Sequence, residues 1–429
     1  MRLIAIILAA VILVSCASDD PGSQAESSKD NDSSRITPSV PSEPQDSQPD
    51  NSQPDNSDVI LAPRSNTKIE VFDNSGKRIG ELENNGCVTL CNRGIVYCSA
   101  ADNGDDLKNE FNLFDAKTGK TTRLGWIEGE IFENVFNRIE IGDHVYTLVI
   151  KGNLYDDEPD PVYLVDIDLN GLVATHTITD DGFAYMSMCE HNGKLLIRLH
   201  DQQDKTLFDR IFEYDPSTGK KREVITAELD DGEKGNTFRQ IWSDGKNVYV
   251  LRIAMNGLSD VKMMLDTYDA EYNKISEKDI TGLFLAANKD RSPEDISSEM
   301  RQPVAYFRVY DGRYIYYENF SVSRFFADLE TGEHLIETNG VFSASNGSGK
   351  TFWFWSFGGR EAGDELSLNG VFELHDGKLE KSLYTDPTDS RYEIWSACSS
   401  ADGTRMYHCG YKDPDTGELL PSKLTVVGK

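Results

Sequence analysis

The chain has 429 residues, with 73 acidic and 43 basic side chains, and a formal net charge of −30 at pH 7. This balance excludes nucleic acid as a partner, because phosphate binding needs a basic surface. It also argues against direct binding of the folded part to anionic lipid. The length exceeds that of one ordinary domain unless the fold is built from repeats.

The first residues predict an export signal. Arg2 precedes an apolar run from Leu3 to Val14, which is too short to cross a bilayer as a helix but has the length of a secretory signal. The run ends in Leu13-Val14-Ser15-Cys16, which resembles the lipobox of bacterial lipoproteins. The resemblance covers residues 1–16. It implies a signal peptide over 1–15, cleavage before Cys16 and diacylglycerol on its sulfur, whose acyl chains anchor the protein to a membrane. The alternative is an ordinary signal peptide with a chance cysteine.

Residues 16–58 predict a disordered tether. The segment is rich in Ser, Asp, Pro, Gln and Asn, and the motif Ser-Gln-Pro-Asp-Asn occurs in tandem at 47–51 and 52–56. Such a composition cannot bury enough apolar surface to offset chain entropy. We therefore expect an acidic protein that is extracytoplasmic and lipid-anchored to the outer face of the cell membrane, an arrangement that suits a Gram-positive-type envelope.

Residues 59–429 predict an all-β domain, because short β-branched and aromatic runs alternate with turn signals. One kind of turn uses Asn-Gly or Asp-Gly pairs, which supply the positive φ of tight hairpins. Its instances are Asn92–Gly94, Gly142–Asp143, Asn192–Gly193, Asp244–Gly245, Asp311–Gly312, Asn346–Gly347 and Asp402–Gly403.

A second kind of turn usually follows a strand that ends in Asp, which is expected to cap the turn while Gly takes the left-handed position. Its instances are Asp73–Gly76, Asp115–Gly119, Asp168–Gly171, Asp215–Gly219, Asp269–Asn273, Asp328–Gly332 and His375–Gly377.

Seven turns of each kind at intervals of about 50 residues are typical of a β-propeller of four-stranded blades. With strands a to d numbered from the axis outward, the first kind joins a to b and the second joins c to d. We expect seven blades, with the N- and C-terminal segments completing one blade together, which removes exposed edges. A turn-like segment at 413–417 leaves open whether that blade is shared two-to-two or three-to-one. Ser292-Pro293-Glu294-Asp295 predicts one short helical insertion near 290–301.

The repeats over about 60–429 resemble the broad group of bacterial propellers that includes TolB-like and pyrroloquinoline-quinone-like domains. The resemblance is architectural, because no blade carries a specific family fingerprint such as Trp-Asp. It implies no enzymatic activity, since a fold does not determine a function.

The two sides of the predicted propeller differ. The a–b and c–d turns share one side, called here the turn side, and are short; the b–c and d–a connections share the other, called the loop side, and hold the long insertions. Long loops on a rigid scaffold usually carry binding. The candidate binding residues on the loop side are Asp156, Asp157, Glu158, Asp160, Asp180, Asp181, Asp230, Asp231 and Phe357.

The chain carries no complete motif for catalysis or metal binding. Asp166-Ile-Asp168-Leu-Asn170-Gly171 begins like a calcium loop, but Thr177 stands where the bidentate Glu belongs, so we interpret it as a c–d turn. The histidines show no zinc-site spacing, and no nucleophile elbow or phosphate-binding loop is present. We predict no cofactor, no metal and no catalytic residue. Tyr314, Tyr316, Tyr317, Trp353 and Trp355 are expected to fill the core.

Six cysteines follow Cys16. Export permits disulfides. A two-residue turn at Asn92-Arg93 would place Cys87 opposite Cys98, and a turn centred on Gly403-Thr404 would place Cys398 opposite Cys409. Buried free thiols are the equal alternative, and Cys91 and Cys189 have no evident partner.

Three functions are compatible with this sequence. The favoured hypothesis is a membrane-anchored, non-enzymatic binding module that presents its loop side to a protein, peptide or glycan. The alternatives are a scaffold in envelope assembly and a carboxylate-dependent enzyme acting on polysaccharide, whose acid pair converges only in space.

Overall fold

A computed structural model gives the architecture of the chain. The chain divides at Leu61, and everything below concerns the second unit, Ala62–Lys429. The structure describes residues 62–63, 67–73, 75–84, 88–102, 107–128, 131–133, 138–151, 161–179, 182–203, 206–230, 234–257, 260–288, 292, 296–297, 300, 304–319, 324–337, 346–347, 351–354, 370–375, 378–381, 393–399, 405–412 and 419–427.

Nearly all of these residues form antiparallel sheets. The first sheet consists of β4 (Val88–Cys91), β5 (Gly94–Asp102), β6 (Leu107–Asp115) and β7 (Lys120–Glu128), with β1 (Ala62–Pro63) on the end of β5. In the second, β8 (Ile131–Glu133) and β9 (Ile139–Ile141) both pair with β10 (His144–Lys151), followed by β11 (Val162–Asp168) and β12 (Leu172–Thr179).

An eight-stranded sheet follows. Its first half, the 182–230 unit, holds β13 (Gly182–His191), β14 (Lys194–Gln203), β15 (Thr206–Asp215) and β16 (Lys220–Asp230). Its second half, the 234–279 unit, holds β17 (Lys234–Ser243), β18 (Val248–Asn256), β19 (Val261–Tyr268) and β20 (Lys274–Asp279). The halves are joined by the pairs Leu229–Gly235 and Asp230–Lys234 between β16 and β17.

Three more sheets complete the described part. One holds β21 (Val304–Tyr310), β22 (Tyr314–Asn319), β23 (Arg324–Asp328) and β24 (His334–Glu337). The next holds β26 (Thr351–Phe354), β27 (Gly370–His375) and β28 (Lys378–Lys381). The last runs through β25 (Asn346–Gly347), β29 (Glu393–Ser399), β30 (Arg405–Lys412), β31 (Leu419–Val427), β2 (Thr67–Phe72) and β3 (Arg78–Asn84).

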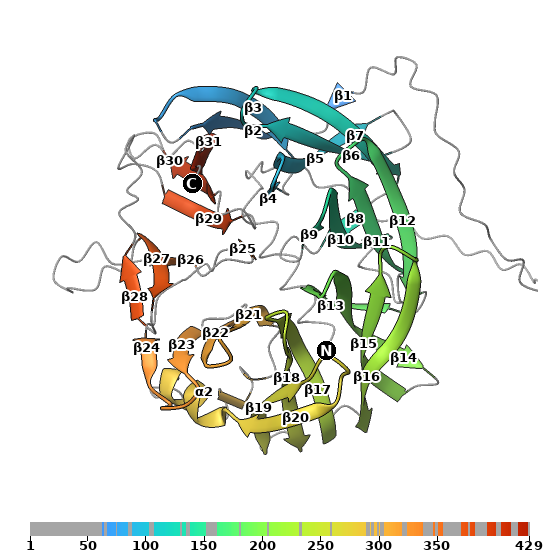
Figure 1. Cartoon of the computed structure of the whole chain (residues 1–429), viewed down its shortest axis with the longest axis vertical. Helices are drawn as coiled ribbons and strands as arrows, with labels where there is room; N and C mark the ends of the chain where they lie inside the picture. Colours follow the sequence, from blue (N-terminus) through green and yellow to red (C-terminus); the bar gives the residue numbers. More distant parts are fainter. Residues whose placement is uncertain are drawn as a thin grey trace, which may run out of the picture. The chain divides into compact units, whose positions relative to one another are not determined.

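Successive units meet through their first strands, as in a propeller, and the eight-stranded sheet counts as two such units. Strand β13 contacts β9 and β17, β17 contacts β21, and β29 contacts β4 of the first sheet; Figure 1 shows the same order around a common centre. The predicted all-β propeller fold is therefore confirmed. The number of seven blades stays a prediction.

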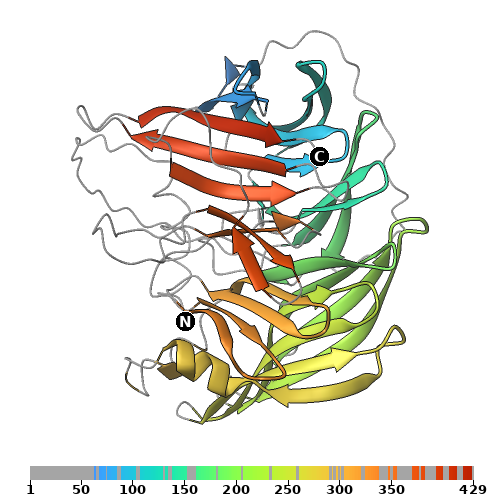
Figure 2. The same cartoon turned by 60° about the vertical axis from the view of Figure 1, so that its left-hand side comes forward.

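The sheet at the chain ends closes differently from either predicted split. The C-terminal segment contributes β29, β30 and β31, and the N-terminal segment contributes the β2–β3 hairpin (Figure 2). Strand β2 runs parallel to β31, with Ile69 opposite Ser422 and Thr425 opposite Phe72. The sharing is thus three-to-two, because residues 413–418 connect β30 to β31 while the N-terminal hairpin keeps both of its strands.

The a–b turn predicted at Asn346–Gly347 is wrong. These two residues form β25, which pairs in parallel with Cys398 and Ser399 of β29. An Asn-Gly pair favours a tight hairpin only where both flanking segments pair with each other, and here the pairing partner is distant in sequence.

The N-terminal hairpin packs on both neighbours. Ile69, Val71 and Leu82 are buried in one cluster with Leu424 of β31 and Phe114 of β6. A Cβ atom at Gly80 would lie 2.4 Å from Cε2 of Phe114. The side chains of the hairpin therefore pack between β31 of the closing sheet and β6 of the first sheet.

Six of the seven predicted c–d turns are built as predicted, and the turn at His375–Gly377 lies partly outside the described residues. Six aspartates each accept a hydrogen bond on Oδ1 from the backbone N–H two residues further on: Asp73, Asp115, Asp168, Asp215, Asp269 and Asp328. Five of these turns hold a glycine at positive φ: Gly76, Gly119, Gly171, Gly219 and Gly332. Each turn is thus closed by its own residues.

The 280–303 insertion contains the helix α2 (Thr281–Ala287), which begins before the predicted span and buries Leu283 and Phe284. Inside that span, Ile296, Ser297 and Met300 are helical, and the Ile296 N–H donates to the Ser292 carbonyl at 2.9 Å. No helix among the described residues is long and apolar enough to cross a membrane.

The parallel β2–β31 pairing yields a prediction about domain limits. A domain that starts at Val59 should fold, because it keeps the hairpin, whereas one that starts at Asn85 should lose cooperative unfolding or melt far lower, because Leu424 and Phe114 lose their cover. Thermal unfolding of both proteins by circular dichroism measures this. Equal melting temperatures would contradict closure by the hairpin.

Candidate functional site

The two ends of the sheets differ in the length of their connections. Between described strands, no a–b or c–d connection exceeds five residues. The longest connections all join b to c or d to a, which places them at the opposite ends of antiparallel strands; they are 152–161, 280–303, 355–369 and 382–392. The predicted division into a turn side and a loop side is therefore present.

Most of the predicted binding residues lie outside the described residues: Asp156, Asp157, Glu158, Asp160, Asp180, Asp181, Asp231 and Phe357. Asp230 ends β16 opposite Lys234, at the loop-side end of the link between the two halves of the eight-stranded sheet. Cys16 also lies outside the described residues. These assignments stay predictions.

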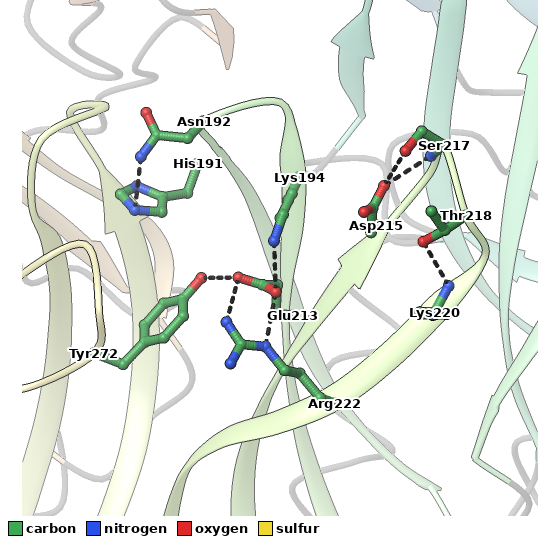
Figure 3. Close-up of polar contacts among 10 residues, drawn as sticks. All are labelled: His191, Asn192, Lys194, Glu213, Asp215, Ser217, Thr218, Lys220, Arg222 and Tyr272. Atoms are coloured by element: carbon green, nitrogen blue, oxygen red, sulfur yellow. Dashed lines mark hydrogen bonds and ion pairs between the residues drawn. The ribbon is translucent and has the colours of Figure 1, made fainter.

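A polar cluster on the turn side is centred on Glu213, near the end of β15 (Figure 3). Its carboxylate accepts hydrogen bonds from Lys194 Nζ at 2.8 Å, from Arg222 Nε and Nη2 at 2.8 and 3.1 Å, and from the Tyr272 hydroxyl at 2.6 Å. Strand pairing explains the arginine, since Glu213 and Arg222 are direct partners in β15 and β16. Tyr272 comes from the 234–279 unit, so the cluster joins the two units.

This carboxylate is unsuited to act as a base. The Arg222 guanidinium, with Lys194 and Tyr272, holds the pKa of Glu213 at about 2, although burial works in the other direction. Because this pKa is depressed, the stability that the cluster provides is present above pH 4.5 and is lost as the pH falls from 4.5 to about 2. With four donors on one carboxylate, the arrangement fixes the two units to each other rather than activating a substrate.

Tyr272 occupies a backbone conformation that favours glycine. Its φ is +66°, which is unfavourable for a bulky side chain and costs on the order of 1–3 kcal/mol. The other five capped turns use glycine in the left-handed region. Two contacts are made from this strained position. The Tyr272 hydroxyl donates to Glu213, and the Arg222 Cζ atom lies 5.6 Å from the centroid of the Tyr272 ring. Sequence reasoning missed the cluster, although the absence of glycine from Asp269–Asn273 was a visible signal.

His191, at the end of β13, forms a second link between the same units. The side chain is 2% exposed, and its Nδ1 lies 2.8 Å from the Ser243 hydroxyl at the end of β17. Its Nε2 lies 3.1 Å from the side-chain amide of Asn192, and its ring packs against Tyr272 at 6.1 Å. Burial lowers the pKa of His191 below its usual value.

The calcium-like stretch forms a turn, as interpreted. Asp168 Oδ1 accepts bonds from the backbone N–H and side-chain amide of Asn170, and Asp166 Oδ1 lies 2.7 Å from His144 Nδ1. Within the described residues, no group of His, Cys, Asp or Glu could hold a metal ion.

The aromatic residues of β22 are buried, as expected for core packing. Tyr314, Tyr316 and Tyr317 are 8%, 1% and 0% exposed, and Tyr317 stacks on Phe325 at 5.1 Å. Trp353 lies in β26, while Trp355 lies outside the described residues.

The cysteine predictions have different outcomes. Cys87 lies outside the described residues, but the two-residue turn that its pairing with Cys98 requires is present, with Cys91 opposite Gly94. The condition for Cys398–Cys409 fails, because Cys398 faces Met406 and Cys409 faces Ile394. Cys91 and Cys189 are buried free thiols, and burial raises the pKa of Cys91 to about 11.

Comparison with known proteins finds only distant structural likenesses. No family model matches the chain, and no curated protein matches it. Among solved structures, the β-propeller domain of the Trilobed protease from Pyrococcus furiosus is 12% identical with a TM-score of 0.36, over 66% of this chain and 83% of that one. Pyrococcus horikoshii acylaminoacyl peptidase is 11% identical with a TM-score of 0.39, over 82% of this chain and 59% of that one. Synechocystis apocarotenoid oxygenase is 11% identical with a TM-score of 0.30, over 58% and 60%.

The chain therefore spans less than two thirds of the peptidase and of the oxygenase chains. The described sheets define this protein as an all-β propeller protein, and no function is taken from these likenesses.

The Glu213 cluster yields a stability prediction. Tyr272→Phe should lower the free energy of unfolding by about 1.5–3 kcal/mol, because it removes a hydrogen bond to a charged acceptor and keeps the strained backbone. Urea unfolding at pH 7 measures the loss. The matched control is Tyr97→Phe, whose hydroxyl lies 3.5 Å from the neutral Thr121 hydroxyl and should cost much less. Equal losses would show that Glu213 does not hold Tyr272.

Proposed function

We propose that this protein is a lipid-anchored, extracytoplasmic binding module. In this proposal Cys16 carries the lipid, residues 16–58 form the tether, and the propeller presents its loop side to a protein, peptide or glycan. The acidic composition supports a partner that is not nucleic acid.

The observation that carries the proposal is the placement of the long connections. The four longest connections that link described strands within or between sheets, 152–161, 280–303, 355–369 and 382–392, are all on the loop side. A rigid scaffold that concentrates its variable loops at one end is the usual arrangement of a binding protein.

The chemistry of the turn side supports the same choice. Its capping aspartates already accept backbone N–H groups, and Glu213 already accepts four donors. Polar groups that are satisfied within the fold offer little to a partner. The acids of 156–160 belong to no such turn in the sequence, and their charges suit a cationic partner surface.

The anchor is tested by Cys16→Ser. The variant should lose lipidation and leave the detergent phase in a phase-partitioning experiment with lipid-labelled cells, because no other cysteine lies near the signal. Ser18→Ala is the control and should partition like the unchanged protein. Continued partitioning of Cys16→Ser into detergent would rule out the lipobox interpretation.

The binding side is tested by charge neutralisation. Changing Asp156, Asp157, Glu158 and Asp160 to their amides should slow association with a partner captured from intact envelopes by roughly tenfold at low salt, because exposed charges steer encounter. The melting temperature should hardly change, since exposed charges contribute little to stability. Surface plasmon resonance at several salt concentrations measures the rate.

The matched control neutralises four exposed turn-side acids that do not cap turns: Asp143, Glu271, Glu330 and Glu333. It makes the same change in net charge. Loss of binding in the control alone, or equally in both sets, would contradict the loop-side assignment.

A further inference from the structure

The junction between the 182–230 unit and the 234–279 unit contains a histidine whose two ring nitrogens both have partners. The Asn192 amide nitrogen donates to Nε2 of His191, so the proton of the neutral ring lies on Nδ1 and is donated to the Ser243 hydroxyl. The same hydroxyl accepts the backbone N–H of Gly245 at 3.0 Å. His191 therefore holds the end of β17 and the turn that follows it.

Four charged side chains from four different segments lie near His191. Glu190 lies on its own strand, Lys194 begins β14, Glu213 lies on β15, and Asp244 follows β17. Arg222 of β16 and Tyr272 reach this group through Glu213.

Each of the three carboxylates is occupied elsewhere. Glu190 accepts the Gly193 N–H at 2.6 Å, Asp244 accepts the N–H groups of Lys246 and Asn247, and Glu213 accepts its four donors. A protonated His191 would thus keep its buried position without a carboxylate bound to it, and its new Nε2 proton would face the amide NH₂ of Asn192, where two donors repel.

We propose that this junction is an acid-sensitive latch, in which protonation of His191 breaks its bond to Asn192, leaves an unpaired charge in a buried site, and so loosens the hold that His191 has through Ser243 on the 234–279 unit. The inference does not depend on the proposed function, because it concerns contacts inside the propeller.

The direction of the pH effect follows from burial. The pKa of His191 is lowered from its ordinary 6.5 by burial, against the acids around it. The closed junction is therefore fully stable above pH 6.5 and weakens as the pH falls below it, because the opened state binds a proton that the closed state excludes. Glu213 stays ionised in this range, since its pKa is about 2, so Tyr272 still holds the two units together and the opening is local.

Hydrogen exchange of the full chain at pH 7.5, 6.0 and 5.0, corrected for intrinsic exchange rates, tests the latch. Peptides that cover His191–Gly193 and Ser243–Asn247 should be protected at pH 7.5, and their opening should increase by up to about tenfold per pH unit below 6.5. In His191→Gln, whose amide hydrogen-bonds but does not titrate, this pH dependence should disappear.

The control is His144→Gln, which removes another turn-side histidine, 2.7 Å from Asp166, and should leave the pH dependence intact. If His191→Gln does not fold, Ser243→Ala provides the test, because it should open the junction already at pH 7.5. An unchanged pH response in His191→Gln, an acid-insensitive junction in the unchanged protein, or full protection at pH 7.5 in Ser243→Ala would each overturn the proposal.

Discussion

The parallel pairing of β2 with β31 is the constraint on which the arrangement of sheets depends. A series of sheets that meet through their first strands has two ends, and each end would expose apolar surface and an unpaired edge. Here Leu424 of the last strand and Phe114 of the first complete sheet are covered by the same hairpin, through Ile69, Val71 and Leu82. The hairpin pairs with β31 through its backbone and packs on β6 through its side chains. The first and last parts of the domain therefore share one hydrophobic core.

Within that structure, the c–d turns of different units are closed by the same local hydrogen bonds. The units differ in the side chains that connect one unit to the next. The capping aspartates close their turns with local backbone groups, so a c–d turn needs nothing from its neighbours. Asp166 and Glu213 each stand two residues before a capping aspartate, and His144 and Lys194 each begin the b strand beside them. The same position thus holds a local polar pair in two successive units. In the second unit a tyrosine from the c–d turn of the following unit joins the pair, which then links the 182–230 unit to the 234–279 unit.

The features that sequence could predict are those whose cause is local. Asp and Gly at fixed offsets specify a turn without reference to distant residues, and six of the turns have the predicted cap. Period-two patterning likewise indicates strands wherever they pair. The parallel pairing of β2, the pairing of Asn346 with Cys398 and the register that separates Cys398 from Cys409 depend on partners far away in the chain, so no local signal specifies them.

Sequence also failed where local signals were absent or contrary. Helix α2 has no side-chain cap on Ile280 and no acid in its first turn. The Asp279 side chain accepts the Thr281 N–H at the start of the helix, a signal that was missed in favour of the proline at 293. The Glu213 cluster escaped because its donors come from three separate elements, β14, β16 and the turn after β19, and proximity of this kind appears only after folding. Tyr272 is the one member of the cluster that the sequence could have indicated. The other five capped turns have glycine at the left-handed position, and a tyrosine there points to a contact outside its own turn.

The capped turns and the His191 junction respond to acid at different pH values. Interactions with nearby hydroxyl, amide and backbone groups hold the pKa values of the capping residues Asp73, Asp215 and Asp269 below their ordinary value, so these turns keep their charged caps well below pH 6. Burial also lowers the pKa of His191, but the ordinary pKa of histidine is 6.5, and only the neutral ring accepts the Asn192 amide on Nε2. Between about pH 6.5 and 4.5 the turns and the Glu213–Tyr272 bond are therefore intact while the bond from Asn192 to His191 weakens. A fold whose four-stranded units are closed by their own turns, and whose junction titrates first, can change the fit between two neighbouring units without unfolding either of them.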